Sequence, residues 1–167
     1  NGIIIDERAI LNTPEFSRGM FTVQSTSSLR SIELLAPKPG DQVLDICAAP
    51  GGKTTAMAEL MLDSGEILAS DIYEHRVKLI RELSSRLELS CIDAITMDAS
   101  IYNEDMKERF DKVLADVPCS GLGVIAGKPE LKLRVDLNEF PGLYQLQYKI
   151  LENAFLYLKP GGDLVYS

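Results

Sequence analysis

Residues 42–55 read QVLDICAAPGGKTT, an apolar run that leads into two glycines and a lysine. Such a run is typical of a strand buried on both faces of a parallel sheet. The following Gly-Gly-Lys-Thr comes close to the phosphate-binding pattern G-x-x-x-x-G-K-[ST], but that pattern needs glycine at position 47, where this chain has Cys47. The stretch therefore predicts a strand, a ligand-binding loop and a helix, and it leaves open whether the ligand is a nucleoside triphosphate.

Strand and helix patterns alternate on both sides of this stretch. We expect strands over 42–47, 66–71, 92–98, 110–116 and 163–167, and helices over 25–36, about 54–62, 73–87 and 143–158. Repeated strand–helix units form parallel sheets that helices cover on both faces. The predicted fold class is therefore α/β, with a doubly wound, mostly parallel sheet over 25–167. Residues 1–24 are expected to form an N-terminal extension of short strands and turns.

Composition narrows the class of protein. The 167 residues are 46% hydrophobic and 25% charged, which suits one domain with a buried core. No apolar run is long enough for a membrane span and no targeting segment is visible, so we expect a cytoplasmic protein without membrane contact. Three scattered cysteines predict neither disulfides nor a metal site. The net charge of −8 argues against a general nucleic-acid-binding surface, and the best local candidate is the basic stretch 128–134, KPELKLR.

Acidic residues end four of the expected strands: Asp45, Asp71, Asp98 and Asp116. Ligands of such sheets bind beyond the carboxyl ends of the strands. One aspartate there is common in turns, but four in succession indicate a site. Asp71 lies about twenty residues past the glycines, where a carboxylate can accept hydrogen bonds from ribose hydroxyls. Asp98 suits an adenine amino group, so the pattern favours S-adenosylmethionine, an adenosine cofactor without a phosphate tail.

Three motifs resemble the Nol/Nop/Sun family of RNA cytosine-5 methyltransferases: DICAAPGGKTT (45–55), DVPCSG (116–121) and GGDLVYS (161–167). FTVQ (21–24) and GVIAGKPELK (123–132) are most similar to the bacterial Sun-type enzymes that methylate 16S ribosomal RNA. The resemblance covers nearly the whole chain. It implies a Rossmann-like methyltransferase fold, truncated here after the fifth core strand, with RNA (ribosomal RNA foremost) as partner. We also expect a monomer that binds no metal.

The resemblance also implies a set of site residues. The cofactor would contact Cys47, Ala48, Ala49, Pro50, Gly51, Gly52, Lys53, Asp71, Asp98 and Asp116, and the catalytic residues would be Cys119 and Asp116. In this family a cysteine thiolate adds to carbon 6 of cytosine, which makes carbon 5 electron-rich enough to accept the methyl group. That cysteine belongs to a Thr-Cys pair expected just after Ser167, whereas Cys119 assists product release. We therefore expect the chain to be part of a longer protein and to be inactive alone.

Several alternatives stay open. Cys119 itself is the nucleophile if the chain works like DNA cytosine-5 methyltransferases, which share a Pro-Cys after the fourth strand. The substrate could be transfer RNA, the loop could bind ATP with magnesium, or the chain could be a non-catalytic cofactor-binding module. Among single residues, Cys47 is more simply a buried loop residue than a reactive thiol, and His75 a solvated residue at the rim of the pocket.

Overall fold

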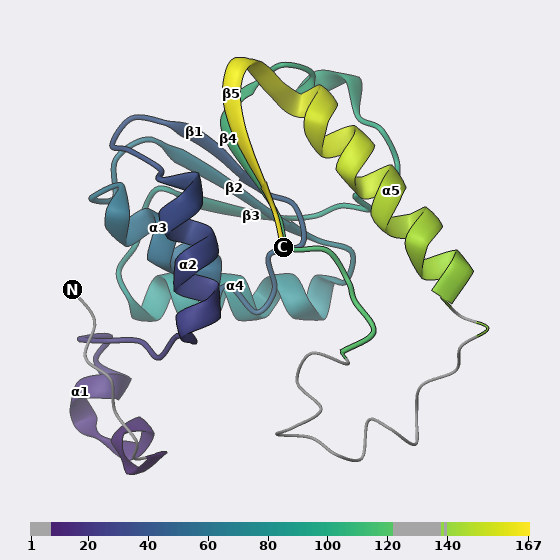
Figure 1. Cartoon of the computed structure of the whole chain (residues 1–167). Coiled ribbons are helices and arrows are strands. Elements are labelled where there is room, and N and C mark those ends of the chain that lie inside the picture. The colour runs from purple at the N-terminus through teal and green to yellow at the C-terminus, as the bar shows by residue number, and fades with distance from the viewer. Residues whose placement is uncertain (1–7, 122–137, 139) are drawn as a thin grey trace.

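A computed structural model of the chain describes residues 8–121, 138 and 140–167, and its centre is one five-stranded sheet (Figure 1). The strands are β1 (Gln42–Asp45), β2 (Glu66–Asp71), β3 (Ile92–Thr96), β4 (Phe110–Ala115) and β5 (Leu158–Tyr166). They lie in the order β3-β2-β1-β4-β5, and every neighbouring pair is parallel. The predicted α/β class and parallel sheet are confirmed. The carboxyl ends of β1, β2 and β4 lie side by side, which brings Asp45, Asp71 and Asp116 to one edge.

Helices cover both faces of the sheet. On one side lie α2 (Thr26–Leu35), α3 (Gly52–Leu60) and α4 (Glu74–Arg86), and on the other lie α5 (Phe140–Tyr157) and the short 3-10 helix η2 (Glu104–Met106) (Figure 1). The alternation of side chains along each strand builds two cores. Leu44, Leu68 and Val113 pack with α5, whereas Val43, Ile67 and Leu114 pack with α2 and α3. The helices thereby fix the strands, and with them the loops at the carboxyl edge.

The N-terminal segment differs from its prediction. Instead of strands, the described part contains a 3-10 helix, η1 (Arg8–Asn12), and a one-turn helix, α1 (Pro14–Ser17), which the Thr13 side chain caps. A capping threonine before proline favours a helix start over a strand. Residues 1–7 lie outside the described part, and the domain boundary at residue 24 stays a prediction.

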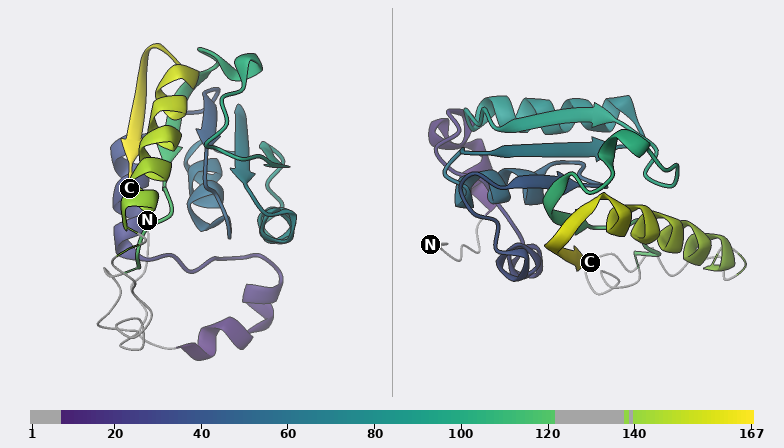
Figure 2. Two further views of the ribbon diagram at one scale, coloured as in Figure 1. Left: turned by 90° about the vertical axis from the view of Figure 1, so that its right-hand side faces the viewer. Right: turned by 90° about the horizontal axis from the view of Figure 1, so that it is seen from above.

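Arg86, at the end of α4, fastens this segment to the rest of the molecule. Its guanidinium donates hydrogen bonds to the carbonyl oxygens of Phe16 (2.6 Å) and Phe21 (3.2 Å) and lies 4.1 Å above the Phe16 ring. Gly19 has φ +74°, and a Cβ there would lie 1.8 Å from the Arg86 carbonyl oxygen. From this attachment an extended stretch leads back to α2 (Figure 2).

The start of β5 is a second difference. The fifth strand was expected over 163–167, but β5 begins at Leu158 and includes the stretch Lys159–Gly162. The register with β4 shifts inside this stretch, because Phe110 pairs with Leu158 and Lys112 with Asp163. The glycines are therefore part of an irregular strand start. The other predicted helices and strands are confirmed, with ends that differ by a few residues.

Candidate active site

The loop between β1 and α3 forms a close-fitting cradle at the carboxyl edge of the sheet. Its Ala48 amide donates to the Ser70 carbonyl oxygen (2.8 Å) on neighbouring β2. Gly51 caps α3 at φ +103°, and a Cβ there would lie 3.2 Å from Ile80 Cα. A side chain at Gly52 would lie 3.1 Å from Gln24 Oε1. The backbone path therefore requires glycine at position 51, whereas a Cβ at position 52 would displace the Gln24 side chain. The path leaves main-chain amides free of intrahelical partners at the N-terminus of α3.

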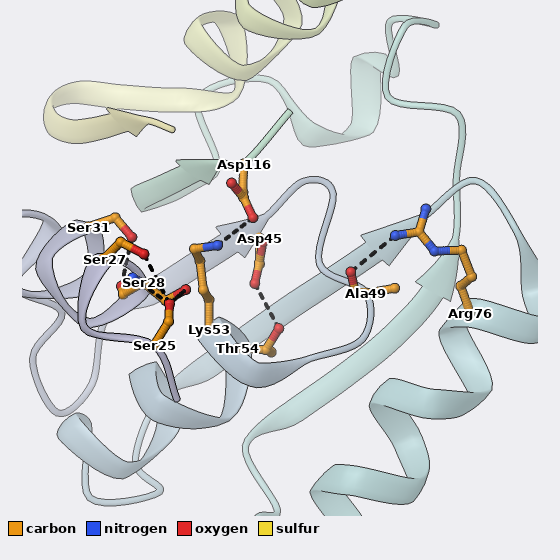
Figure 3. Close-up of polar contacts among 10 residues, drawn as sticks. All are labelled: Ser25, Ser27, Ser28, Ser31, Asp45, Ala49, Lys53, Thr54, Arg76 and Asp116. Carbon is orange, nitrogen blue, oxygen red and sulfur yellow. Dashed lines mark hydrogen bonds and ion pairs between the residues drawn. The ribbon is translucent and has the colours of Figure 1, made fainter. Parts of the chain in front are cut away.

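Asp45 is buried beneath this cradle, with 1% of its surface exposed. Its Oδ2 accepts a hydrogen bond from the Thr54 hydroxyl on α3 (2.7 Å) (Figure 3). Among the described residues its Oδ1 has no hydrogen-bond partner, a condition shared by one other buried side-chain atom, Gln24 Nε2. Burial raises the pKa of Asp45 to about 7, and the nearby Asp116 and Asp71 carboxylates add to the effect. A buried carboxylate with an unpaired oxygen destabilises the fold, which points to a role beyond structure.

Lys53 joins the cradle to the end of β4. Its Nζ lies 2.5 Å from Asp116 Oδ2, and the two side chains are 18% and 35% exposed (Figure 3). This contact crosses from the first residues of α3 to the strand that precedes the Pro118-Cys119 segment. The predicted cofactor loop and the predicted catalytic segment therefore meet at one partly exposed ion pair.

Arg76 was missed by the sequence analysis. From α4 its guanidinium contacts Asp71 Oδ2 (3.3 Å) and donates to the Ala49 carbonyl oxygen in the cradle (3.1 Å). Asp71 is buried, and its Oδ1 accepts from the Tyr73 amide (3.3 Å). An arginine five positions after an acidic strand end, on the first turns of the next helix, is the sequence signal that would have identified it.

A backbone hydrogen bond places Asp98 near Asp71: the amide of the preceding residue, Met97, donates to the Asp71 carbonyl oxygen (3.0 Å). Asp98 follows β3 by two residues, and its Oδ1 accepts from the Ser100 amide (2.9 Å) and hydroxyl (2.7 Å). These bonds hold the carboxylate in one orientation at the edge of the sheet. The structure thus brings together the loop 47–53, Asp71, Asp98 and Asp116 at one edge.

The three cysteines differ sharply in their surroundings. Cys119 is exposed, and the preceding Pro118 carbonyl oxygen accepts from Gln147 Nε2 of α5 (2.8 Å). Burial raises the pKa of Cys47 to about 12, with the Asp45 charge adding to it, and burial also raises that of Cys91 to about 12. Thiolate formation is therefore suppressed at Cys47 and Cys91.

Two other predicted features make no polar contact with the cradle among the described residues or fall outside them. His75 is exposed and stacks on Tyr73 at a centroid distance of 5.5 Å. The basic stretch 128–134 falls outside the described residues. Within the described ranges no helix is long and apolar enough to cross a membrane, and no cluster of His, Cys, Asp and Glu is arranged to hold a metal ion.

Comparison with known proteins identifies the family. Residues 32–167 match the family described as 16S rRNA methyltransferase RsmB/F. The chain belongs to this family. Among relatives of RsmB/F type, a probable ribosomal RNA small subunit methyltransferase B of Bacillus subtilis is 43% identical over 95% of the chain. The ribosomal RNA small subunit methyltransferase B of Photorhabdus laumondii is 39% identical over 98% of it. The chain spans 36% and 38% of their lengths.

Solved structures agree with the RsmB/F assignment. NSun6 from Pyrococcus horikoshii, crystallised with the S-adenosylmethionine analogue SFG, has a TM-score of 0.82 at 33% identity, covering 93% of this chain and 40% of that one. A methyltransferase homologue from the same organism has a TM-score of 0.81 at 38% identity, with coverages of 94% and 48%. The RsmB/F family and these neighbours are S-adenosylmethionine-dependent methyltransferases. The predicted family, fold and cofactor are thereby confirmed, and a triphosphate loop is set aside.

Proposed function

We propose that the complete protein transfers a methyl group from S-adenosylmethionine to carbon 5 of a cytosine in 16S ribosomal RNA. The observation that carries this proposal is the Lys53–Asp116 contact of 2.5 Å, which joins the cofactor cradle to the strand end next to the exposed Cys119. A cofactor on the cradle and a base beside Cys119 would meet at this ion pair. The names of the ribosomal RNA methyltransferase relatives support the substrate class.

The residues of the cradle fit the cofactor. Gly51 and Gly52 let the main chain approach a ligand, and the N-terminal amides of α3 suit its carboxylate. The buried Asp71 suits the ribose hydroxyls, and Asp98, held by Ser100, suits the adenine amino group. When bound, S-adenosylmethionine supplies an electrophilic methyl group.

The chain's own residues would prepare the target base. Asp116 is proposed to hydrogen-bond the ring-nitrogen side of cytosine and to stabilise the adduct in which a thiol has added to carbon 6. Lys53 holds Asp116 in place by their ion pair. Cys119 is proposed to assist release of the methylated product, while the attacking thiolate comes from another cysteine. The high pKa values of Cys47 and Cys91 support neither of them in that role.

Ribosomal RNA is preferred to transfer RNA as the substrate, because the matching relatives carry ribosomal names. The target base would be reached in a loop or by flipping out of a helix. We place the reaction in the cytoplasm. The predicted monomer stays a prediction.

The test is methylation of unmodified 16S ribosomal RNA by the complete protein, followed by nuclease digestion and mass spectrometry of the nucleosides. The expected product is 5-methylcytidine, and a methyl group at any other position would overturn the proposal. Cys119→Ala separates the two thiol roles, since a covalent RNA–protein adduct should accumulate if Cys119 assists release. Disappearance of every adduct would make Cys119 the nucleophile. Cys91→Ala, at the opposite end of the sheet, is the matched control and should turn over normally.

A further inference from the structure

Among the described residues, the carboxyl edge carries more negative than positive charge close to Asp45. Three carboxylates from adjacent strands, Asp45, Asp71 and Asp116, face two cations, Lys53 from α3 and Arg76 from α4. Lys53 pairs with Asp116 and Arg76 with Asp71, so the two outer carboxylates have partners. Asp45 is the carboxylate that has no cation of its own in this group.

Its unpaired oxygen is the feature that the fold does not explain. Within the part of the chain that the structure describes, one hydrogen bond, from the Thr54 hydroxyl, reaches the Asp45 carboxylate, and Oδ1 has no partner although the residue is 1% exposed. An asparagine would accept the same bond from Thr54 without the cost of burying a charge. A negative charge at this place therefore serves something other than packing.

We propose that the Asp45 carboxylate is a specificity determinant that makes the site favour cationic S-adenosylmethionine over the neutral thioether left after methyl transfer. The inference rests on the proposed function of the cradle. Methyl transfer breaks the bond between sulfur and the methyl carbon, and sulfur keeps the electron pair. The cofactor thereby loses one positive charge, while the adenosine and amino-acid parts that the cradle would hold remain the same.

A difference in ligand charge changes the binding free energy through the long-range electrostatic interaction with Asp45. With an effective dielectric constant of about 20, one unit charge about 10 Å away changes an affinity by roughly tenfold. Asp45 needs no direct contact for this effect, which agrees with its place beneath the loop. The ionised carboxylate lowers the free energy of the cationic ligand, and its protonated form does not. Product is thereby released more readily than fresh cofactor.

The discrimination should depend on pH, because burial raises the pKa of Asp45 to about 7. Below this value Asp45 is protonated and the two ligands should bind with similar strength. Above it the carboxylate is ionised, so the affinity ratio of S-adenosylmethionine to S-adenosylhomocysteine should rise about tenfold. By linkage, the cationic ligand should lower the pKa of Asp45 by the same free energy.

The experiment is calorimetric titration of the complete protein with S-adenosylmethionine and with S-adenosylhomocysteine at several values of pH between 5.5 and 8. The measured quantity is the ratio of the two dissociation constants. Asp45→Asn keeps an acceptor for Thr54 and should hold the ratio near its low-pH value throughout. His75→Gln removes the single histidine within residues 1–167 and should leave the wild-type pH profile unchanged.

The outcomes separate this inference from the proposed function. If the wild-type protein binds both ligands at a ratio that neither pH nor Asp45→Asn changes, the inference fails alone. An equal loss of both ligands in a folded Asp45→Asn variant has the same meaning, because it assigns Asp45 a structural role. If the complete wild-type protein binds neither ligand, the proposed function of the cradle is overturned and the inference with it.

Discussion

Asp45 at the carboxyl edge of the parallel sheet and Asp111 and Asp163 at the amino edge are in opposite states. At the amino edge, Asp111 accepts from the Gln42 amide (2.9 Å) and from Lys159 Nζ (2.8 Å), and Asp163 pairs with Lys112. These bonds lower the pKa values of Asp111 and Asp163. At the carboxyl edge, burial raises the pKa of Asp45 instead.

The direction of the pKa shift distinguishes Asp45 from Asp111 and Asp163. A carboxylate whose pKa is lowered in the folded chain contributes to stability at neutral pH, whereas one whose pKa is raised destabilises the fold there. Aspartates and lysines occur at both edges, so their mere presence does not locate the site. Groups kept at a cost to stability cluster where ligands bind.

The largest expected effect is on the rate of methyl transfer, and it should differ between substitutions at the two ends of β4. Asp116→Asn in the complete protein should lower the rate of methyl transfer about 1,000-fold, because general acid–base or charged groups in a site contribute about 10²–10⁴. Asp111→Asn, the same change at the amino end of this strand, should leave the rate within about threefold if the edges differ as described. Single-turnover rates with labelled cofactor measure both. Similar losses in the two variants would remove the distinction.

Asp45 gives the next largest effect, on stability. Its ordinary value of 3.8 rises to about 7 in the folded chain, so the folded state holds an extra proton between these values. The wild-type free energy of unfolding therefore falls as pH rises through this window, and Asp45→Asn lacks this fall. From pH 4 to pH 8 the variant should gain on the order of a few kcal/mol relative to wild type. Urea unfolding at each pH measures the difference, and parallel profiles would contradict the expectation.

Two glycines with positive φ, one at each edge, allow the edges to be compared by the cost of adding a side chain. Gly51 in the cradle has φ +103°, and Gly40, before β1 at the amino edge, has φ +92°. A Cβ at Gly51 would lie 3.2 Å from Ile80 Cα, whereas at Gly40 nothing lies within 4 Å. Gly40→Ala should cost about 1 kcal/mol from backbone strain alone, and Gly51→Ala about 2 kcal/mol or more, with weaker cofactor binding. Thermal unfolding with and without S-adenosylmethionine tests this order.

The smallest effect is expected for the partly exposed ion pair at the amino edge. Lys159 and Asp111 are 39% and 36% exposed, so water screens their attraction. Lys159→Met should change the free energy of unfolding by less than about 1 kcal/mol, and methyl transfer should not change. Denaturant unfolding is the measurement. A loss of several kcal/mol would mean that this ion pair contributes more to stability than its exposure indicates.

Much of this architecture was predictable because apolar runs and turn residues mark strands in parallel sheets directly. Asp45, Asp71, Asp98 and Asp116 were found as strand ends without any structure. Arg76 and Gln24 were not, since their roles depend on which helix or segment folds back over the cradle. The state of Asp45 was also invisible, because burial and an unpaired oxygen are properties of three-dimensional packing. The helices before residue 24 were not predicted, because Thr13 was not recognised as a helix cap.

The attachment at Arg86 has an evolutionary consequence. Its guanidinium binds carbonyl oxygens of residues 16 and 21, and every amino acid carries such an oxygen. Apart from the contact with the Phe16 ring, the attachment therefore does not depend on the side chains of the N-terminal segment. Side-chain substitutions at Phe21 should leave these two hydrogen bonds in place, while Arg86 and Gly19 should resist replacement. The segment can thus diverge in sequence, and acquire new surface contacts, without leaving its place beside the methyltransferase core.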